Sequence, residues 1–330
     1  MTFNRRKIVL LCVASLVTLA SVTAVVPFNT DTGANRDLSE ARATTATATP
    51  KPVHASPPAS SAGEARLAVP AVVMGETAET AESAPALSAP AAEQNRALRD
   101  NLRWTFGGKS QRGWSIYVPL IQRLIGTDED AASEGFAASL ARWQKREGLG
   151  AHGMLDEATL MRMISTWQGR RRKSSTYPQP DQLITAPPAE FWDSSRADDL
   201  RKVERQTYAA YKRMLAAAVS DASLQLAARN GELAASEKYL KIISAFRSRE
   251  YQDRLRKLEP GAGRAALAVN SPHFTGRALD IYVGGEPTIT KDPNRALQTQ
   301  TRAYRWLVRN AERFGFCPYF YEPWHWEYCL

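Results

Sequence analysis

Two histidines near the end of the chain stand in phrases whose residue types could bind a metal ion. Of the four histidines, His273 lies in SPHFTGRALD, which ends at Asp280, and His325 lies in YEPWHW. Zinc takes His nitrogen and Asp or Glu oxygen, and a catalytic site leaves one position for water. His273 and Asp280 flank a tight glycine turn, so they can converge on one ion, with His325 from another strand as the third ligand.

Glu322 supplies the carboxylate that a hydrolytic zinc site needs. It lies three residues before His325, and Pro323 stiffens the connection between them. A carboxylate beside zinc-activated water can act as general base and then pass the proton to a leaving amine. The pattern therefore predicts a zinc peptidase that does not use the helical H-E-x-x-H motif.

These phrases resemble those of the zinc D-alanyl-D-alanine carboxypeptidases, the VanY family. That family shows S-G-Y-R-S-x-x-x-Q, then S-x-H-x-x-G-x-A-x-D, then E-P-W-H. This chain has SAFRS at 244–248 with Gln252 four residues on, and the other two motifs follow in family order. The resemblance implies one Zn²⁺ ion held by His273, Asp280 and His325, with Glu322 as catalytic base.

The same resemblance implies roles for three further residues. Arg247 matches the arginine that faces the substrate carbonyl, where it would stabilise the oxyanion. Ser271 matches a serine near the terminal carboxylate of the substrate, and Gln252 completes the first motif as a substrate-binding position. Departures from the family pattern, such as Ala245 in place of glycine and Pro272 in place of glutamate, affect the substrate pocket and remove no ligand.

The N-terminus carries the pattern of an export signal. Arg5, Arg6 and Lys7 precede an uncharged, mostly apolar stretch at residues 8–26. Cleavage after Ala24 is one reading. A retained anchor is the other, because the stretch is long enough to cross a bilayer core of roughly 30 Å. Both readings place the rest of the chain outside the cytoplasm, in the periplasm or cell envelope.

Composition excludes several classes of protein. The 330 residues include only three cysteines, too few for a disulfide scaffold, and only one long apolar run, too few for a polytopic membrane protein. The net charge of +9 suits an anionic partner such as nucleic acid, anionic lipid or an anionic cell-wall polymer. Export argues against nucleic acid, and we expect membrane contact only through an uncleaved N-terminal segment.

The chain divides into five predicted parts. They are a signal peptide or anchor (1–27), a disordered tether (28–96), a helical module (97–169), a linker (170–190) and a zinc peptidase domain (191–330). The tether is rich in Ala, Thr, Pro and Ser and has no aromatic residue between Phe28 and Trp104. Such a segment cannot bury enough apolar surface to offset its ordering entropy.

The helical module resembles the small three-helix peptidoglycan-binding domains. The resemblance rests on LIQR at 120–123, WQKREGL at 143–149, and Gly153 followed by Asp156 and Thr159. Phe136, Leu140 and Trp143 have helical spacing, and Asp156 can cap a last helix. The basic cluster that follows, at 170–173, could contact anionic polymer or form a solvated boundary.

The pattern of the C-terminal part predicts an α+β domain, with a mainly antiparallel sheet flanked by helices. A disordered tether and a small all-α module precede this domain. We expect helices at 203–218, after Ser248 and at 297–314. We expect strands at 240–246 and 278–283, the latter half-buried, and an aromatic hairpin at 316–328. Cys317 and Cys329 bracket this hairpin and could form a disulfide; a structural zinc site and two free thiols are the alternatives.

These observations predict an exported hydrolase of peptidoglycan stem peptides, most simply a D-alanyl-D-alanine carboxypeptidase. An L,D-carboxypeptidase or an endopeptidase would use the same site. A non-catalytic wall-binding protein with a degenerate peptidase domain is the alternative from another class.

Overall fold

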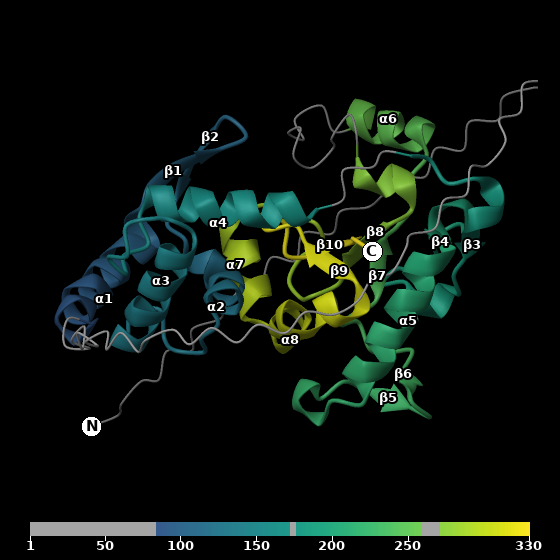
Figure 1. Ribbon diagram of the computed structural model, residues 1–330. Helices are drawn as coiled ribbons and strands as arrows, with labels where there is room; N and C mark the ends of the chain where they lie inside the picture. The colour runs from purple at the N-terminus through teal and green to yellow at the C-terminus, as the bar shows by residue number, and fades with distance from the viewer. Residues whose placement is uncertain (1–83, 172–175, 259–270) are drawn as a thin grey trace, which may run out of the picture. The chain divides into compact units, whose positions relative to one another are not determined.

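The computed structural model describes residues 84–171, 176–258 and 271–330 (Figure 1). The predicted signal segment and residues 28–83 of the predicted tether lie outside these ranges, as do Arg172 and Lys173 of the basic cluster. All of the described residues lie in one compact unit. None of the described helices is both long enough and apolar enough to cross a membrane.

The first part of this unit is mainly helical. Its elements are α1 (Ala84–Asn101), β1 (Arg103–Phe106), β2 (Lys109–Arg112), η1 (Ser115–Tyr117), α2 (Val118–Ile125), α3 (Glu134–Arg146) and α4 (Glu157–Arg170). The predicted apolar face of α3 is confirmed, since Phe136, Leu140 and Trp143 are buried. The predicted cap of α4 is confirmed as well, because the carboxylate of Asp156 accepts a hydrogen bond from the amide of Thr159 at 2.8 Å.

Helix α1 differs from the prediction, because residues 84–96 of the expected tether are helical. Ala91 and Ala92 are buried with Ala137, which allows close helix packing without large side chains. Asn95 is fully buried. Its side-chain nitrogen Nδ2 donates to the carbonyl of Gly153, and its side-chain oxygen Oδ1 accepts from the backbone amide of Leu155. Alanines and one asparagine give little core signal in a sequence, and so the helix was missed.

The module is also not all-α, since it contains the β1–β2 hairpin. Gly107 and Gly108 both have positive φ, at 58° and 75°, as a tight hairpin turn requires. Trp104 and Phe106 alternate along β1, so both side chains lie on the inner face of the hairpin. The paired glycines were the signal for this hairpin in the sequence.

The second part alternates short strands and helices. Before the main sheet come η2 (Pro180–Gln182), β3 (Leu183–Thr185), η3 (Pro188–Glu190), η4 (Asp198–Arg201), β4 (Lys202–Glu204), α5 (Arg205–Val219), η5 (Ala222–Leu224), β5 (Ala228–Arg229) and β6 (Glu232–Leu233). Then follow β7 (Ile242–Ser244), α6 (Arg249–Leu258), η6 (Pro272–Thr275), β8 (Ala278–Ile281), α7 (Asp292–Gln300), α8 (Arg302–Asn310), η7 (Ala311–Phe314), β9 (Phe316–Pro318) and β10 (His325–Tyr328).

The main sheet has four strands in the order β7-β8-β10-β9, and every pair is antiparallel. This confirms the α+β prediction, with helices around a small antiparallel sheet (Figure 1). The predicted half-buried strand is wrong in one respect: all four residues of β8 are buried. Its polar member, Asp280, points into an enclosed site instead of into solvent.

The predicted helix at 297–314 is interrupted. Thr301 has extended backbone, ends α7, and caps α8 by accepting a hydrogen bond from the amide of Tyr304 at 3.2 Å. Gly315 then ends the segment with φ of 89°, as predicted. The helix that was expected at residues 203–218 begins at Arg205, and Val203 lies in β4.

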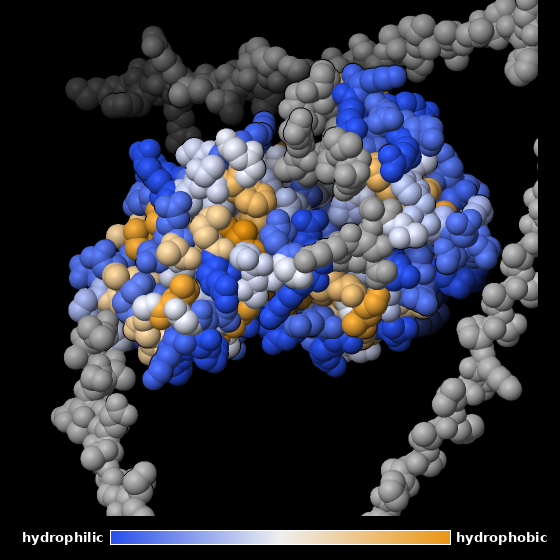
Figure 2. Space-filling model, turned by 45° about the horizontal axis from the view of Figure 1, so that its top comes forward, coloured by the Kyte–Doolittle hydropathy of each residue, from blue (hydrophilic) through white to orange (hydrophobic). Residues whose placement is uncertain are grey.

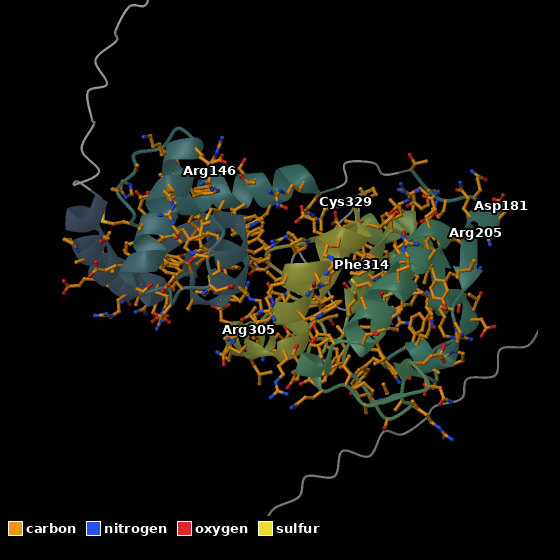
Figure 3. All side chains as sticks on the ribbon, turned by 60° about the horizontal axis from the view of Figure 1, so that its bottom comes forward. Arg146, Asp181, Arg205, Arg305, Phe314 and Cys329 are labelled. Carbon is orange, nitrogen blue, oxygen red and sulfur yellow. A yellow bond between two sulfur atoms is a disulfide. The ribbon has the colours of Figure 1, made fainter. Side chains whose placement is uncertain are left out.

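The predicted linker is ordered from residue 176 onward. β3 pairs with β4, and Ala186 is fully buried. Arg205 donates to the carbonyl of Asp181 at 3.0 Å, and the two residues lie side by side in Figure 3. Residues 176–190 therefore pack onto the C-terminal region.

One continuous apolar core joins the helical part to the sheet. Phe320, 1% exposed, lies at the junction, with its ring centroid 4.8 Å from Phe106, 5.5 Å from Tyr117 and 5.9 Å from Trp167. The face shown in Figure 2 is mainly hydrophilic, with hydrophobic residues in separate patches. Apolar side chains of the two parts are therefore buried against each other in this shared core.

The C-terminal hairpin is closed by a disulfide between Cys317 and Cys329, whose Cα atoms are 6.1 Å apart. This bears out the predicted pairing over the structural-zinc alternative. The bond ties β9 to the end of β10, and Figure 3 shows Cys329 at this edge of the sheet.

Candidate metal centre and active site

Strand register brings two of the predicted ligands together. His325 on β10 is the direct antiparallel partner of Asp280 on β8. Side chains on directly paired residues lie on the same face of the sheet with their Cβ atoms about 5 Å apart. His325 Nδ1 is accordingly 3.0 Å from Asp280 Oδ1.

The third predicted ligand arrives from a short turn of helix. His273 lies in η6, which Gly276 ends with a left-handed φ of 67°. His273 Nε2 is 3.2 Å from the same Oδ1 atom of Asp280. The turn allows the imidazole of His273 to reach the carboxylate of Asp280, seven residues later in the sequence.

These three side chains fit a divalent metal ion. Each offers one ligand atom, and the three atoms lie within 4.8 Å of one another in a buried site. His273 Nδ1 is 2.6 Å from the carbonyl of Ala245, which only accepts, so Nδ1 carries the proton and Nε2 is free to bind. Two imidazole nitrogens and one carboxylate oxygen are a donor set that zinc accepts.

His325 is oriented by Glu327, a residue that the sequence analysis missed. His325 Nε2 is 3.2 Å from Glu327 Oε1, and both side chains are buried. The carboxylate accepts the proton on Nε2 and so directs Nδ1 toward Asp280. The spacing of two along β10 was the available signal, because alternate residues of a strand share a face.

Arg247 lies against the carboxylate at the centre of the site. Its guanidinium donates to Asp280 Oδ2 at 2.7 Å and to the hydroxyl of Ser244 at 2.9 Å. Its backbone amide also donates to the carbonyl of His273. The structure therefore brings the predicted oxyanion-stabilising arginine to the predicted ligands, while its role toward substrate stays a prediction.

The electrostatics of the site shift the pKa values of its two imidazoles in opposite directions. Burial, with Arg247 nearby, lowers the pKa of His273 to about 4. Burial also disfavours the imidazolium of His325, but hydrogen bonds to Asp280 and Glu327 outweigh it and raise that pKa to about 9. Burial alone would raise the pKa of Asp280; the two histidines and Arg247 hold it well below its usual range.

Glu322 is a buried carboxylate with an oxygen that has no hydrogen-bond partner. Its residue is 7% exposed, and Oε1 is unpaired among the described residues. Burial raises the pKa of Glu322 to about 7, against the opposing effect of His325. Its backbone carbonyl accepts from the amide of His325, which fixes it beside the ligands. A carboxylate of this kind is suited to accept a proton near neutral pH.

The two remaining predicted residues have structural contacts. The hydroxyl of Ser271 accepts from the amide of His273 and caps η6. Gln252 is fully buried on α6, and its backbone N–H donates to the carbonyl of Ser248. Their proposed contacts with substrate stay predictions.

Comparison with known proteins identifies the region that carries this site. Residues 201–330 match the family model VanY, described as D-alanyl-D-alanine carboxypeptidase. A comparison with curated proteins found no match. The matched region contains all seven of the predicted site residues and Glu327.

Proposed function

We propose that this chain is a zinc-dependent hydrolase of peptidoglycan stem peptides, because residues 201–330 match the family model VanY, described as D-alanyl-D-alanine carboxypeptidase. The bond that we propose is the terminal D-Ala-D-Ala bond, with release of one D-alanine. The carrying observation is the buried cluster of His273, Asp280 and His325 beside the unpaired carboxylate of Glu322.

Each residue of the site has a place in this reaction. A Zn²⁺ ion held by His273, Asp280 and His325 would polarise the scissile carbonyl and acidify water. Glu322 accepts the proton of the attacking water and passes it to the nitrogen of the leaving D-alanine. The guanidinium of Arg247 adds positive charge where the carbonyl oxygen becomes negative.

The test uses the purified full chain, loaded with zinc, and muropeptides that end in a tetrapeptide or a pentapeptide. Products are weighed by mass spectrometry. Loss of one alanine from the pentapeptide alone supports the proposal. Glu322→Gln, which keeps the shape of the side chain and removes its basicity, is the matched control and should be inactive.

Other products would identify the alternatives. Loss of alanine from the tetrapeptide would mean an L,D-carboxypeptidase, and larger fragments would mean an endopeptidase. A folded, zinc-loaded protein that leaves both substrates unchanged would favour a non-catalytic wall-binding protein. In that case Glu322→Gln should bind the wall as well as wild type does.

We also propose that the enzyme is exported and acts in the periplasm or cell envelope. Support comes from the basic and apolar residues at 5–26 and from the net charge of +9, which suits a carboxylate-rich wall. Fusion of residues 1–30 to a reporter that is active only outside the cytoplasm tests this. An inactive reporter would contradict export.

A further inference from the structure

We infer that Arg171, the residue that directly follows α4, is a positioning residue for the metal centre, acting on His325 through Glu327. This inference rests on the proposed function for its catalytic consequence. Its structural basis is a chain of contacts that runs from α4 to β10.

The first contact joins Arg171 to Glu327. The guanidinium of Arg171 donates from Nη2 at 2.5 Å and from Nε at 2.9 Å to the same oxygen, Glu327 Oε1. These residues are 156 apart in the sequence. The side chain of Arg171 is 21% exposed and that of Glu327 is 2% exposed. The ion pair is thus largely shielded from water, where such contacts are strong.

The second contact joins Glu327 to the predicted ligand. The same Oε1 atom lies 3.2 Å from Nε2 of His325. The other oxygen, Oε2, is buried and has no hydrogen-bond partner among the described residues. Arg171 is therefore the cation that lies closest to the buried carboxylate of Glu327 and offsets its charge. Without it, an ionised carboxylate would be buried with only His325 as partner.

A third contact links Arg171 to His325 through Tyr319. The guanidinium lies over the ring of Tyr319, 4.1 Å from its centroid. Tyr319 packs edge-on against the imidazole of His325, with centroids 5.8 Å apart. Arg171 thus contacts two of the side chains that pack against the imidazole, Glu327 and Tyr319, and it limits the positions that the ring can adopt.

The helical module holds this arginine in place. Its amide donates to the carbonyl of Gln168, and its Nη1 donates to the side chain of Gln168 at 3.0 Å. The guanidinium of Arg170, the preceding residue, instead lies 4.0 Å from the exposed carboxylate of Glu312. Of these adjacent arginines, Arg171 alone points toward the metal centre. The module therefore contributes to the active site, beyond any binding of the wall.

The geometry has a clear consequence for metal binding. Glu327 keeps the proton on Nε2 of His325 and leaves Nδ1 as the ligand atom. Residues that orient a ligand in this way typically change metal affinity or activity by about 10- to 100-fold when they are removed. We therefore expect Arg171→Ala to weaken zinc binding by about that factor.

The experiment measures zinc affinity of the full chain by competition with a chromophoric chelator. The variants are Arg171→Ala, Arg171→Lys, Glu327→Gln and the double variant Arg171→Ala/Glu327→Gln, with Arg170→Ala as matched control. We expect Arg171→Ala to bind zinc more weakly than wild type and Arg171→Lys to restore part of the lost zinc affinity. Arg170→Ala should bind zinc with wild-type affinity. In the Glu327→Gln background the further loss from Arg171→Ala should be small, since the arginine then has no charge to hold.

Three results would overturn the inference. These are wild-type zinc affinity for Arg171→Ala, an equal loss for Arg170→Ala, and an undiminished loss for Arg171→Ala when Glu327 is already glutamine. Should Arg171→Ala fail to fold, Arg171→Gln, which keeps a donor without the charge, is measured with the same expected loss.

Activity on muropeptides is measured in parallel. We expect Arg171→Ala to lower kcat more than it raises KM, because the residue does not touch substrate. Zinc affinity is measured without substrate. A wild-type protein that binds zinc but hydrolyses nothing would therefore refute the proposed function and leave the affinity comparison as the test of Arg171.

Discussion

At the scale of single residues, the site combines a carboxylate that is fully paired with one that has an unpaired oxygen. Asp280 is paired with two histidines and Arg247. Glu322 instead lies buried with an unpaired oxygen and a pKa of about 7. A charged carboxylate without partners costs stability, and such residues are found where chemistry requires them.

The raised pKa of Glu322 predicts opposite effects of Glu322→Gln on activity and stability. Since the pKa is above its value in the unfolded chain, this group lowers the stability of the metal-free protein as pH rises from about 4.5 to about 7. Glutamine removes that penalty, on the order of 3 kcal/mol above pH 7. It should also lower kcat by at least about 100-fold, since the base is lost.

Thermal unfolding of the metal-free proteins at pH 5 and pH 8 checks the stability effect. The variant should have a higher melting temperature than wild type at pH 8 and nearly the same melting temperature at pH 5. A lower melting temperature than wild type at both pH values would mean that Glu322 has stabilising contacts that outweigh its burial.

At the scale of elements, the turn η6 has to bring His273 back to the sheet within a few residues. Gly276 makes this possible. Its φ is 67°, and a Cβ atom there would lie 3.1 Å from Glu204 Cβ and from the amide nitrogen of Glu204. The position therefore requires glycine for both backbone and space.

Gly276→Ala should reduce stability and zinc affinity together. Gly231 in the β5–β6 turn has a similar φ of 79° but no atom within 4 Å of an added Cβ, so Gly231→Ala is the matched control. The control should cost about 1 kcal/mol through the backbone alone. Gly276→Ala should cost more and displace His273. Denaturant titration and zinc competition measure the two effects; equal costs and unchanged zinc affinity would show that the close approach to Glu204 is not limiting.

The C-terminal hairpin is a second element whose stability can be tested. The disulfide joins residues 12 apart, Cys317 and Cys329. Closing a short loop of this kind stabilises a protein by about 3 kcal/mol in the chain-entropy account. Replacement of both cysteines by serine should lower the free energy of unfolding by about that amount, measured with guanidinium. An unchanged midpoint under oxidising conditions would count against the bond.

At the scale of the whole molecule, the helical part and the sheet share one core. Besides the aromatic cluster at Phe320, buried Arg295 on α7 donates to the hydroxyl of Tyr117 at 3.0 Å and to the carbonyl of Tyr321. A buried arginine of this kind is strongly destabilising when its partners are separated. We therefore expect the two parts to unfold as one cooperative unit.

Phe320→Ala tests this coupling. Truncation of a buried phenylalanine costs about 3–5 kcal/mol, and here the loss should move a single calorimetric transition to lower temperature. Leu297→Ala, at a side chain that is 51% exposed, should have little effect. Two separate transitions in Phe320→Ala or in wild type would show that the parts are independent.

Much of the site and of the fold could be predicted from local patterns. The type and order of His273, Asp280, Glu322 and His325 pointed to a buried zinc site, and the structure brings the three proposed ligands together. Capping by Asp156 and the glycine stop at 315 also followed, because each depends on residues near one another in the sequence. The antiparallel sheet was expected from the order of helices and strands, although it pairs residues as distant in the sequence as Asp280 and His325.

Other features were decided only by tertiary structure. Helix α1 depends on small side chains that match a partner surface, and at the break the hydroxyl of Thr301 donates to the carbonyl of Val283, 18 residues away in the sequence. Most clearly, the sequence placed Arg171 in a basic cluster but could not say what it contacts. Its partner Glu327 is 156 residues away, and such a contact exists only because folding buries a carboxylate where the end of α4 meets β10.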